Sequence, residues 1–471
     1  MAGSITGAAG QPALTPSASK ATLPSNYITD FNFLSQYLPD TYEREFERYG
    51  NRSINSFLRM VGAEMPTNSD LLKWEEQGRL HTKFQGVTLG TYTGAETTQT
   101  LTFTAAHNLR VGQTIFISDE TPGSVLSNKA IVTDAAPAGV LTEATVAYYE
   151  ATQAGFAAAS TMTVFVYGSE FRKGSNGMIG SLDADPVIKD NKPIIIKDKY
   201  VVSGSDMAQI GWVKVTTENG ADGYLWYIKS EHETRMRFDD YLEMSMIEGV
   251  PAAAGSGALA NLSPAPGATA AGTKGMFHEI ENNGNVWSGG NPTALADFDA
   301  IIQRLDKQGA IQENVLFVNR QMGFDIDDML AAQNSYGAGG TSYGLFDNDE
   351  EMALNLGFSG FKRGYEFYKS DWKYLNDATL RGGIVGGAVN GVLVPAGTTN
   401  VYDQIMGKNA QRPFLHVRYR ASETEDRRYK TWITGSAGGA ATSDLDAMEV
   451  NFLSERSLCT LGANNFFIFK S

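Results

Sequence analysis

The stretch GYLWYIKSEHETRMRFDDYLEMSMIE, residues 223–248, decides the fold more than any other. Large apolar residues recur along it at three- and four-residue steps, which is the period of one face of an α-helix. Gly249 and Pro251 follow as stop signals. About 25 residues at 1.5 Å each predict a helix of about 37 Å, longer than an ordinary domain helix. Because Glu231 and His232 lie in the middle of the stripe, we expect several layers to pack across this helix.

Before the helix, residues 86–168 predict a small β-barrel or sandwich. Short alternating runs rich in threonine, alanine and valine are separated by turn residues such as Gly112 and Pro122-Gly123. Lysine and arginine nearly vanish here, which is typical of an inserted module. The predicted strands are TLTFT (100–104), TIFIS (114–118), AIVTD (130–134), ATVAYY (144–149) and TMTVFVY (161–167).

A second β region, residues 183–217, contains DPVIKDNKPIIIKDKYVVSG (185–204). Its strands are apolar apart from a series of lysines, Lys189, Lys192, Lys197 and Lys199. Long exposed strands promote aggregation unless they are charged or covered. The series therefore slightly favours contact with a partner.

The remaining elements surround these parts. Residues 1–26 are rich in Ala, Ser, Thr, Gly and Pro and predict an arm without a core of its own. Helical periods occur at 41–61 and in SDLLKWEEQ (69–77), where Ser69 is a candidate N-cap. After a linker at 252–275 the pattern becomes α/β, with helices predicted at 293–308 and 323–332 and strands at 315–319, 391–395, 413–420, 429–435 and 464–470.

Charge and cysteine content exclude several classes of protein. The chain has 471 residues, and 38 Lys and Arg against 53 Asp and Glu give a net charge of −15. Binding to phosphates needs clustered basic residues, and the basic pairs here are scattered, so the sequence argues against a general nucleic-acid binder. The single cysteine, Cys459, rules out an internal disulfide framework. No stretch reads as a signal peptide or a spanning helix.

The search for catalytic motifs predicts no enzyme and no cofactor. Phosphate-binding, dinucleotide-binding, nucleophile-elbow and zinc-protease motifs are absent from the sequence. The acidic clusters at 325–328 and 347–351 lack the alternation and glycine of a calcium loop, so solvated helix faces are the simpler interpretation. The histidines are far apart and most simply hydrogen-bonded core or interface groups: His81, His107, His232, His278 and His416.

The mixed-charge run ETEDRRYK, residues 423–430, leaves two interpretations open. It is either an intersubunit ion-pair patch or a polar hairpin between two strands. The sequence favours neither.

The order of these pieces resembles the major capsid proteins of tailed bacteriophages, which share the Hong Kong 97-type coat fold. The resemblance rests on an arm, a β-excursion with an inserted module, a long helix, an α/β middle and a β-rich return. The closing stretch, RPFLHVRYRASETEDRRYKTWITGSAGG through NFLSERSLCTLGANNFFIF, is similar to marine or crAss-like phage coat sequences.

The resemblance implies an α+β fold with named parts. We expect an N-terminal arm at 1–40, a helical segment at 41–81 and an E-loop region at 82–215 that contains the inserted all-β domain at 86–168. The peripheral domain would be 216–274 with its spine helix at 223–248, the axial domain 275–382, and the β-rich return 383–471.

The resemblance also implies a function and partners. The chain would be a structural subunit of an icosahedral phage head that assembles in the host cytoplasm as pentamers and hexamers of itself. It would enclose double-stranded DNA without sequence-specific binding, use no membrane, and meet portal, scaffolding and decoration or head-fibre proteins. The arm leaves no room for a cleaved scaffolding segment, so scaffolding would be a separate protein.

Candidate intersubunit contacts combine the lysine series with acidic and basic residues elsewhere. Two other functions stay open: a tail or fibre component, which rarely needs the long helix and α/β middle, and a hydrolase or lyase that would use His278 or Asp325. The contact candidates are Lys189, Lys192, Lys197, Lys199, Glu231, Glu233, Asp239, Asp240, Arg427 and Arg428.

Overall fold

The computed structural model divides the chain into two compact units. Residues 73–189 form one unit, and residues 1–72 together with 190–471 form the other. The expected arm and most of the expected helix at 41–61 lie outside the described residues, which retain Phe57 and Leu58 as helix. The described residues are 57–58, 63–79, 81–90, 96–150, 156, 160–181, 186–208, 215–216, 222–223, 226–260, 271–334, 359–403, 408–437 and 441–471.

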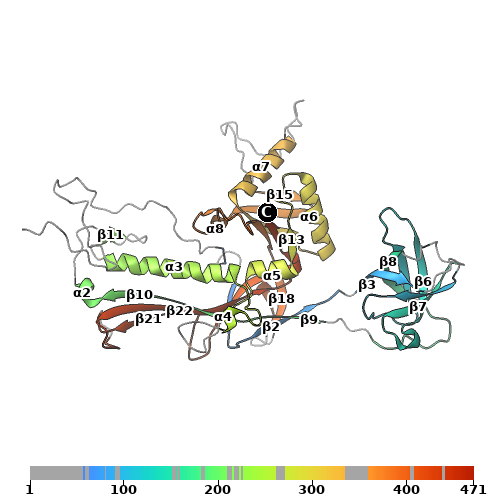
Figure 1. Ribbon diagram of the computed structural model, residues 1–471, viewed down its shortest axis with the longest axis horizontal. Coiled ribbons are helices and arrows are strands. Elements are labelled where there is room, and N and C mark those ends of the chain that lie inside the picture. The colour runs from blue at the N-terminus through green and yellow to red at the C-terminus, as the bar shows by residue number, and fades with distance from the viewer. Residues whose placement is uncertain are drawn as a thin grey trace, which may run out of the picture. The chain divides into compact units, whose positions relative to one another are not determined.

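The unit of residues 73–189 is built around a closed β-barrel (Figure 1). Alternate side chains of its strands, such as Val87, Ile115 and Val164, are fully buried and fill the barrel. All five strands that the sequence predicts are present. In barrel order the strands are β3 (Lys83–Leu89), β4 (Thr98–Thr102), β7 (Glu143–Tyr148), β6 (Ser127–Asp134), β5 (Gln113–Asp119) and β8 (Thr161–Ser169).

The helix expected at 69–77 is wrong, because Leu72–Gln77 is a strand, β2. Its side chains alternate between more and less buried, and it pairs with β9, Pro186–Asn191. Ser69 forms a turn instead of a helix cap: its hydroxyl donates to the carbonyl of Leu71 at 2.9 Å and accepts from the Leu71 N–H at 3.3 Å. Pairing with a distant strand overrides the helical propensity of Leu, Lys and Glu.

The other unit contains a sheet in the order β1-β20-β22-β10, in which β21 also pairs with β22. The long helix α3, Trp226–Glu248, lies along β10 and β22 (Figure 1). It confirms the helix expected at 223–248, although α3 begins at Trp226, three residues after the predicted start. The strands are β1 (Ala63–Thr67), β10 (Ile194–Ser203), β20 (Leu415–Arg420), β21 (Lys430–Gly435) and β22 (Ala447–Thr460).

A second sheet of this unit has the order β13-β23-β17-β14-β16-β15. Two helices pack on it, α6 (Leu295–Gln308) and α7 (Arg320–Asn334). The Asp297 carboxylate accepts the N–H of Ala294 and so caps the start of α6, and Gly309 ends that helix with φ 68°. The strands are β13 (Asn285–Trp287), β14 (Glu313–Val318), β15 (Gly360–Arg363), β16 (Tyr365–Asp371), β17 (Val389–Pro395) and β23 (Phe467–Lys470).

Short elements connect these layers. Among the described residues, no helix combines the length and apolar character that crossing a bilayer requires. The connecting elements are α2 (Gly204–Met207), α4 (Gly257–Ala260), α5 (Met276–Asn283), α8 (Lys373–Asn376), β11 (Val215–Thr216), β12 (Asp222–Gly223), β18 (Thr398–Asp403) and β19 (Lys408–Pro413).

Candidate assembly surface

The inner face of the β10–β22 sheet is covered by α3. Phe238 on the helix is fully buried, stacks on Phe452 with ring centroids 5.7 Å apart, and meets Tyr429 edge-on at 5.4 Å. Val202 of β10 and Val450 of β22 belong to the same apolar cluster. The helix therefore completes a core on this side of the sheet.

The outer face of the same sheet has a different character. Side chains alternate along β10, so Ile195, Lys197, Lys199 and Val201 point away from α3 and are exposed. Ile195 is 53% exposed and Val201 44%. On β21, Trp432 lies on this face too, because it pairs with Asn451, which itself pairs with Lys199. We call Ile195, Lys197, Lys199, Val201 and Trp432 the outer sheet face.

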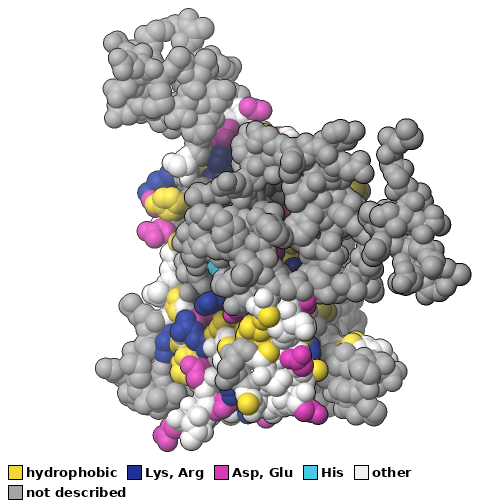
Figure 2. Space-filling view, turned by 90° about the vertical axis from the view of Figure 1, so that its left-hand side faces the viewer, with side chains coloured by type: hydrophobic (Ala, Val, Ile, Leu, Met, Phe, Trp, Pro, Cys, Tyr) yellow, Lys and Arg dark blue, Asp and Glu magenta, His cyan; other side chains and the backbone are white. Residues whose placement is uncertain are grey.

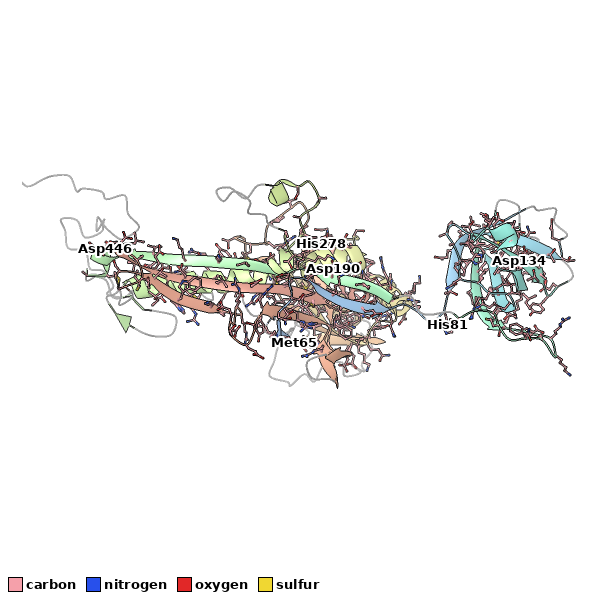
Figure 3. The ribbon with its side chains drawn as sticks, turned by 90° about the horizontal axis from the view of Figure 1, so that it is seen from below. Met65, His81, Asp134, Asp190, His278 and Asp446 are labelled. Atoms are coloured by element: carbon pink, nitrogen blue, oxygen red, sulfur yellow. The ribbon has the colours of Figure 1, made fainter. Side chains whose placement is uncertain are left out.

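The strand β10 is also an edge. It is the last strand in its sheet, with β22 on one side. Among the described residues no strand pairs with its other side, so within that part of the chain its outer row of backbone donors and acceptors is left for a partner strand. Figure 3 labels Asp190, before β10, and Asp446, before β22, toward opposite ends of this ladder. An open edge beside apolar side chains is a surface that a partner strand can extend.

The structure brings only part of the lysine series together. Lys197 and Lys199 lie two residues apart on the outer sheet face, and Lys199 forms an ion pair with Glu449 at 3.3 Å. Lys192 is exposed in the turn before β10. Lys189 is half-buried in β9. The role of these lysines in contact between subunits stays a prediction.

The acidic candidates on α3 are all half-buried. Glu233 forms an ion pair with Lys229 at 3.8 Å. Burial raises the pKa of Tyr200 on β10, and the charge of Glu231 adds to that rise. Asp239 and Asp240 lie about two turns further along, where Asp239 lines a charged cleft.

The run 423–430 forms a polar turn whose charges pair within the chain. Arg427 forms an ion pair with Glu455 at 2.7 Å, and Arg428 pairs with Glu64. Lys430 reaches Glu425 at 2.6 Å. These contacts fit a polar turn, and the role of Arg427 and Arg428 in contact between subunits stays a prediction.

A cleft of about 710 Å³ lies between α3 and the sheet and turns that pack against it. Burial raises the pKa of the Tyr429 phenol there to about 12, with a contribution from Asp239. Arg456, 6% exposed, lies 3.4 Å from Glu64 and donates to the carbonyl of Arg428 at 3.0 Å. Mixed cations and anions on all sides make this cleft an ion network. Its charged lining residues are Glu64, Arg235, Asp239, Glu243, Asp426, Arg428 and Arg456.

Figure 2 looks onto the end of the molecule where α2 and β21 lie in Figure 1. On the described part of that surface, basic, acidic and hydrophobic side chains are interspersed.

Asn191 is a structural residue that sequence reasoning missed. It is 4% exposed at the end of β9. Its Oδ1 accepts from the Thr273 hydroxyl at 3.0 Å and from the N–H of Lys274 at 2.8 Å. Its Nδ2 donates to the carbonyls of Lys274 at 2.9 Å and Leu458 at 2.6 Å. One amide thus anchors the link between β9 and β10 to residues 273–274 and to β22. The only local signal was its place between two charged residues before a proline.

A second missed cluster joins the end of α3 to the turn after α8. The Arg381 guanidinium binds both carboxylate oxygens of Glu248, and the Tyr374 hydroxyl donates to the same carboxylate at 2.6 Å. Arg381 also lies over the ring of Phe277, 5.1 Å from its centroid. The cluster connects the end of α3 with α5, which contains Phe277, and with α8, which contains Tyr374.

The described residues that a hydrolase would use are engaged in structural contacts. Asp325 accepts hydrogen bonds from Asn291 at 2.6 Å and Gln321 at 2.9 Å. The ring of His278 lies beside the Asn282 amide on the same helix. Within the described part of the chain, no three His, Cys, Asp or Glu side chains are grouped to hold a metal ion. Burial raises the pKa of the Cys459 thiol to about 12.

His416 makes stability depend on pH. It is 4% exposed on β20, and burial lowers its pKa to about 4, with a smaller contribution from Arg418. The folded chain keeps it neutral while the unfolded chain protonates it near pH 6.5, so stability is lost as pH falls from about 6.5 to about 4. We expect a loss of about 2 kcal/mol between pH 7 and pH 5.

Urea denaturation at pH 7 and pH 5 measures this loss. The variant His416→Gln, which does not titrate, should lose about 2 kcal/mol less than the unsubstituted chain over the same interval. Equal losses in both proteins would contradict the assignment to His416.

No family model matches this chain, and no curated protein matches it. Solved structures that resemble it come from phages. A chain of Microbacterium phage Oxtober96 is 10% identical, with 92% of this chain and 96% of that chain covered at a TM-score of 0.38. The mature capsid of bacteriophage PhiM1 contains a chain that is 13% identical, with 65% of this chain and 78% of that chain covered at a TM-score of 0.33. A chain of the capsid of Cyanophage P-SCSP1u is 8% identical, with 64% of this chain and 80% of that chain covered at a TM-score of 0.32.

Proposed function

We propose that this chain is the major capsid protein of a tailed phage, a structural subunit that assembles with copies of itself into an icosahedral head of pentamers and hexamers. The observation that carries the proposal is the outer sheet face with its open edge on β10. Two large aliphatic side chains and a strand edge are exposed together there. An interface between subunits covers both at once.

The element order supports a Hong Kong 97-type subunit. In that scheme α3 is the spine helix, and the β-excursion between β2 and β10 is the E-loop, which contains the barrel. The second sheet with α6 and α7 would be the axial domain. The closing strands, with β22 at their centre, would return to the peripheral domain.

The charge distribution suits a container for DNA. The net charge is −15, and Arg427, Arg428, Lys430 and Arg456 are each paired with a carboxylate. A wall without clustered unpaired cations repels packaged phosphate instead of holding it. Portal, scaffolding and decoration proteins would complete the head.

Assembly of the purified chain tests this proposal. We expect negative-stain electron microscopy to show shells or capsomers. Replacing Ile195 by Asp should raise the concentration needed for assembly at least about tenfold, because a charge is placed in the contact. The free energy of unfolding should fall by about 1 kcal/mol, because aspartate disfavours a strand and would lie opposite Glu455.

A matched control is Ile179→Asp, because Ile179 is 84% exposed and belongs to the other unit. It should assemble like the unsubstituted chain. A chain that stays monomeric at high concentration would contradict the proposed function. Normal assembly of Ile195→Asp would contradict the role of the outer sheet face.

A further inference from the structure

The barrel has a row of paired side chains on its outside. Lys83 of β3 pairs with Phe165 of β8, which pairs with Phe116 of β5, which pairs with Lys129 of β6. Directly paired residues point to the same face of a sheet. Since Val164 and its alternating neighbours fill the barrel, the row points outward. Two phenylalanines thus lie between two lysines across four strands.

Further aromatic side chains extend this row. The rings of Phe116 and Phe165 lie 5.2 Å apart, and Tyr167 follows on β8 with Lys129 5.9 Å from its ring centroid. Tyr149 donates its hydroxyl to Glu170 beside them. Exposed fractions are 39% for Phe165, 49% for Tyr167 and 48% for Tyr149. We call Phe116, Lys129, Tyr149, Phe165, Tyr167 and Glu170 the aromatic patch.

Charge on the flanks of the patch narrows the kind of partner. Residues 83–170 contain three Lys or Arg, two of which flank the row. Each flank also has an acid. On one flank Glu170 accepts a hydrogen bond from Tyr149, and the neighbouring Tyr167 lies under the ammonium group of Lys129. Hydrogen bonds from the Gly86 N–H and the Thr163 hydroxyl lower the pKa of the Glu120 carboxyl group. The charge of Lys83 lowers that pKa further, so Lys83 lies near Glu120. Without an excess of cations, a nucleic-acid strand does not suit the patch.

The same charges make the patch complementary to itself. In a twofold contact that reverses the row, the Lys83–Glu120 flank of one copy faces the Lys129–Glu170 flank of the other. Each lysine then meets a carboxylate, and the two phenylalanine pairs meet at the centre. An apolar aromatic centre with a polar rim is the usual anatomy of a protein interface.

We propose that the aromatic patch is a contact between the barrels of two copies of this chain. The inference rests on the proposed function in one respect. A patch of six side chains is too small to hold two free copies together strongly. Copies held in an array meet at a high effective concentration, so a weak contact forms there.

Thiol cross-linking of the full chain tests the contact. The variant Tyr167→Cys places a thiol on the patch, and Thr98→Cys places one on the exposed outer side of β4, a strand that does not border β8 or β5. Cys459 is buried, which keeps the background low. With a short bifunctional maleimide, Tyr167→Cys should give about tenfold more covalent dimer than Thr98→Cys.

Reversing charges on the two flanks tests whether Lys83 of one copy faces Glu170 of the other. Adding Lys83→Glu to the Tyr167→Cys chain should lower the dimer yield about tenfold, because two carboxylates then face each other. Adding Glu170→Lys as well should restore it. Restoration by the second reversal separates a contact between copies from a local change in the barrel.

The outcomes separate this inference from the proposed function. Particles without patch-specific dimers overturn the barrel contact alone and leave the patch to a different protein or a carbohydrate. Dimers from Thr98→Cys in equal yield also overturn it. Patch-specific dimers without particles support it and contradict the proposed function, and the absence of both overturns both.

Discussion

Replacing Asn191 by alanine is expected to lower the free energy of unfolding of the unit that contains it by about 4 kcal/mol. The substitution removes hydrogen bonds to the Thr273 hydroxyl, to the N–H and carbonyl of Lys274 and to the carbonyl of Leu458. Each buried group left without a partner costs about 1–3 kcal/mol. Alanine is too small to fill the space, and water has little access to a site that is 4% exposed in the folded chain.

Urea denaturation followed by tryptophan fluorescence measures this effect. Five of the six tryptophans lie outside residues 73–189, so the signal comes mainly from the unit that contains Asn191. The control is Asn464→Ala, because the Asn464 side chain makes one hydrogen bond, to the carbonyl of Gln308 at 3.2 Å. That variant should lose less than about 1 kcal/mol. Equal effects of the two substitutions would contradict the role of Asn191 as an anchor.

Replacing Phe238 by alanine should cost about 4 kcal/mol. Its ring is 0% exposed between Phe452 and Tyr429, so truncation removes the stacking and leaves a cavity under α3. The effect should appear in the same urea transition. Since α3 covers the sheet at this point, amide hydrogens of β10 should also exchange faster.

Two further variants calibrate this result. Tyr241→Ala, on the same helix at 40% exposure, should cost less than about 1 kcal/mol. Phe238→Leu keeps most of the volume and should recover about half of the lost stability. A loss below about 1 kcal/mol for Phe238→Ala would show that the helix is not held by this cluster.

The candidate site could be predicted only in part. The lysines of β10 were found because exposed apolar strands need cover, and the structure places Lys197 and Lys199 on one face. The pairing of Arg427 with Glu455 could not be found in the same way. Arg427 and Glu455 are distant in the sequence and meet only in the folded sheet, and an ion pair of this kind leaves no local sequence pattern. The arrangement of Asn191 depends on residues 273–274 and 458 and was invisible for the same reason.

The strand β22 shows why some elements resist prediction. It is the longest strand of its sheet and contains Ser454, Glu455, Arg456 and Ser457. Four polar residues in succession lack the alternating apolar pattern of a strand, yet all four are buried. Arg456 donates to Ser454 at 2.9 Å, and Glu455 pairs with Arg427. Tertiary partners make a buried position tolerable for a polar side chain, so hydropathy alone does not predict this strand.

Local periodicity determined the elements that bury one face against a single layer. The strands of the barrel belong to this group, since their apolar side chains recur with the period of the backbone itself. Helix α3 was also predicted from its period, although its last residue, Glu248, contacts Tyr374 and Arg381 beyond the sheet. Contacts distant in sequence decided the rest: β2 became a strand by pairing with β9, and β22 was buried by neighbours on both edges. The physical reason is that a backbone hydrogen bond or an ion pair depends on where two segments meet, which neither segment encodes alone.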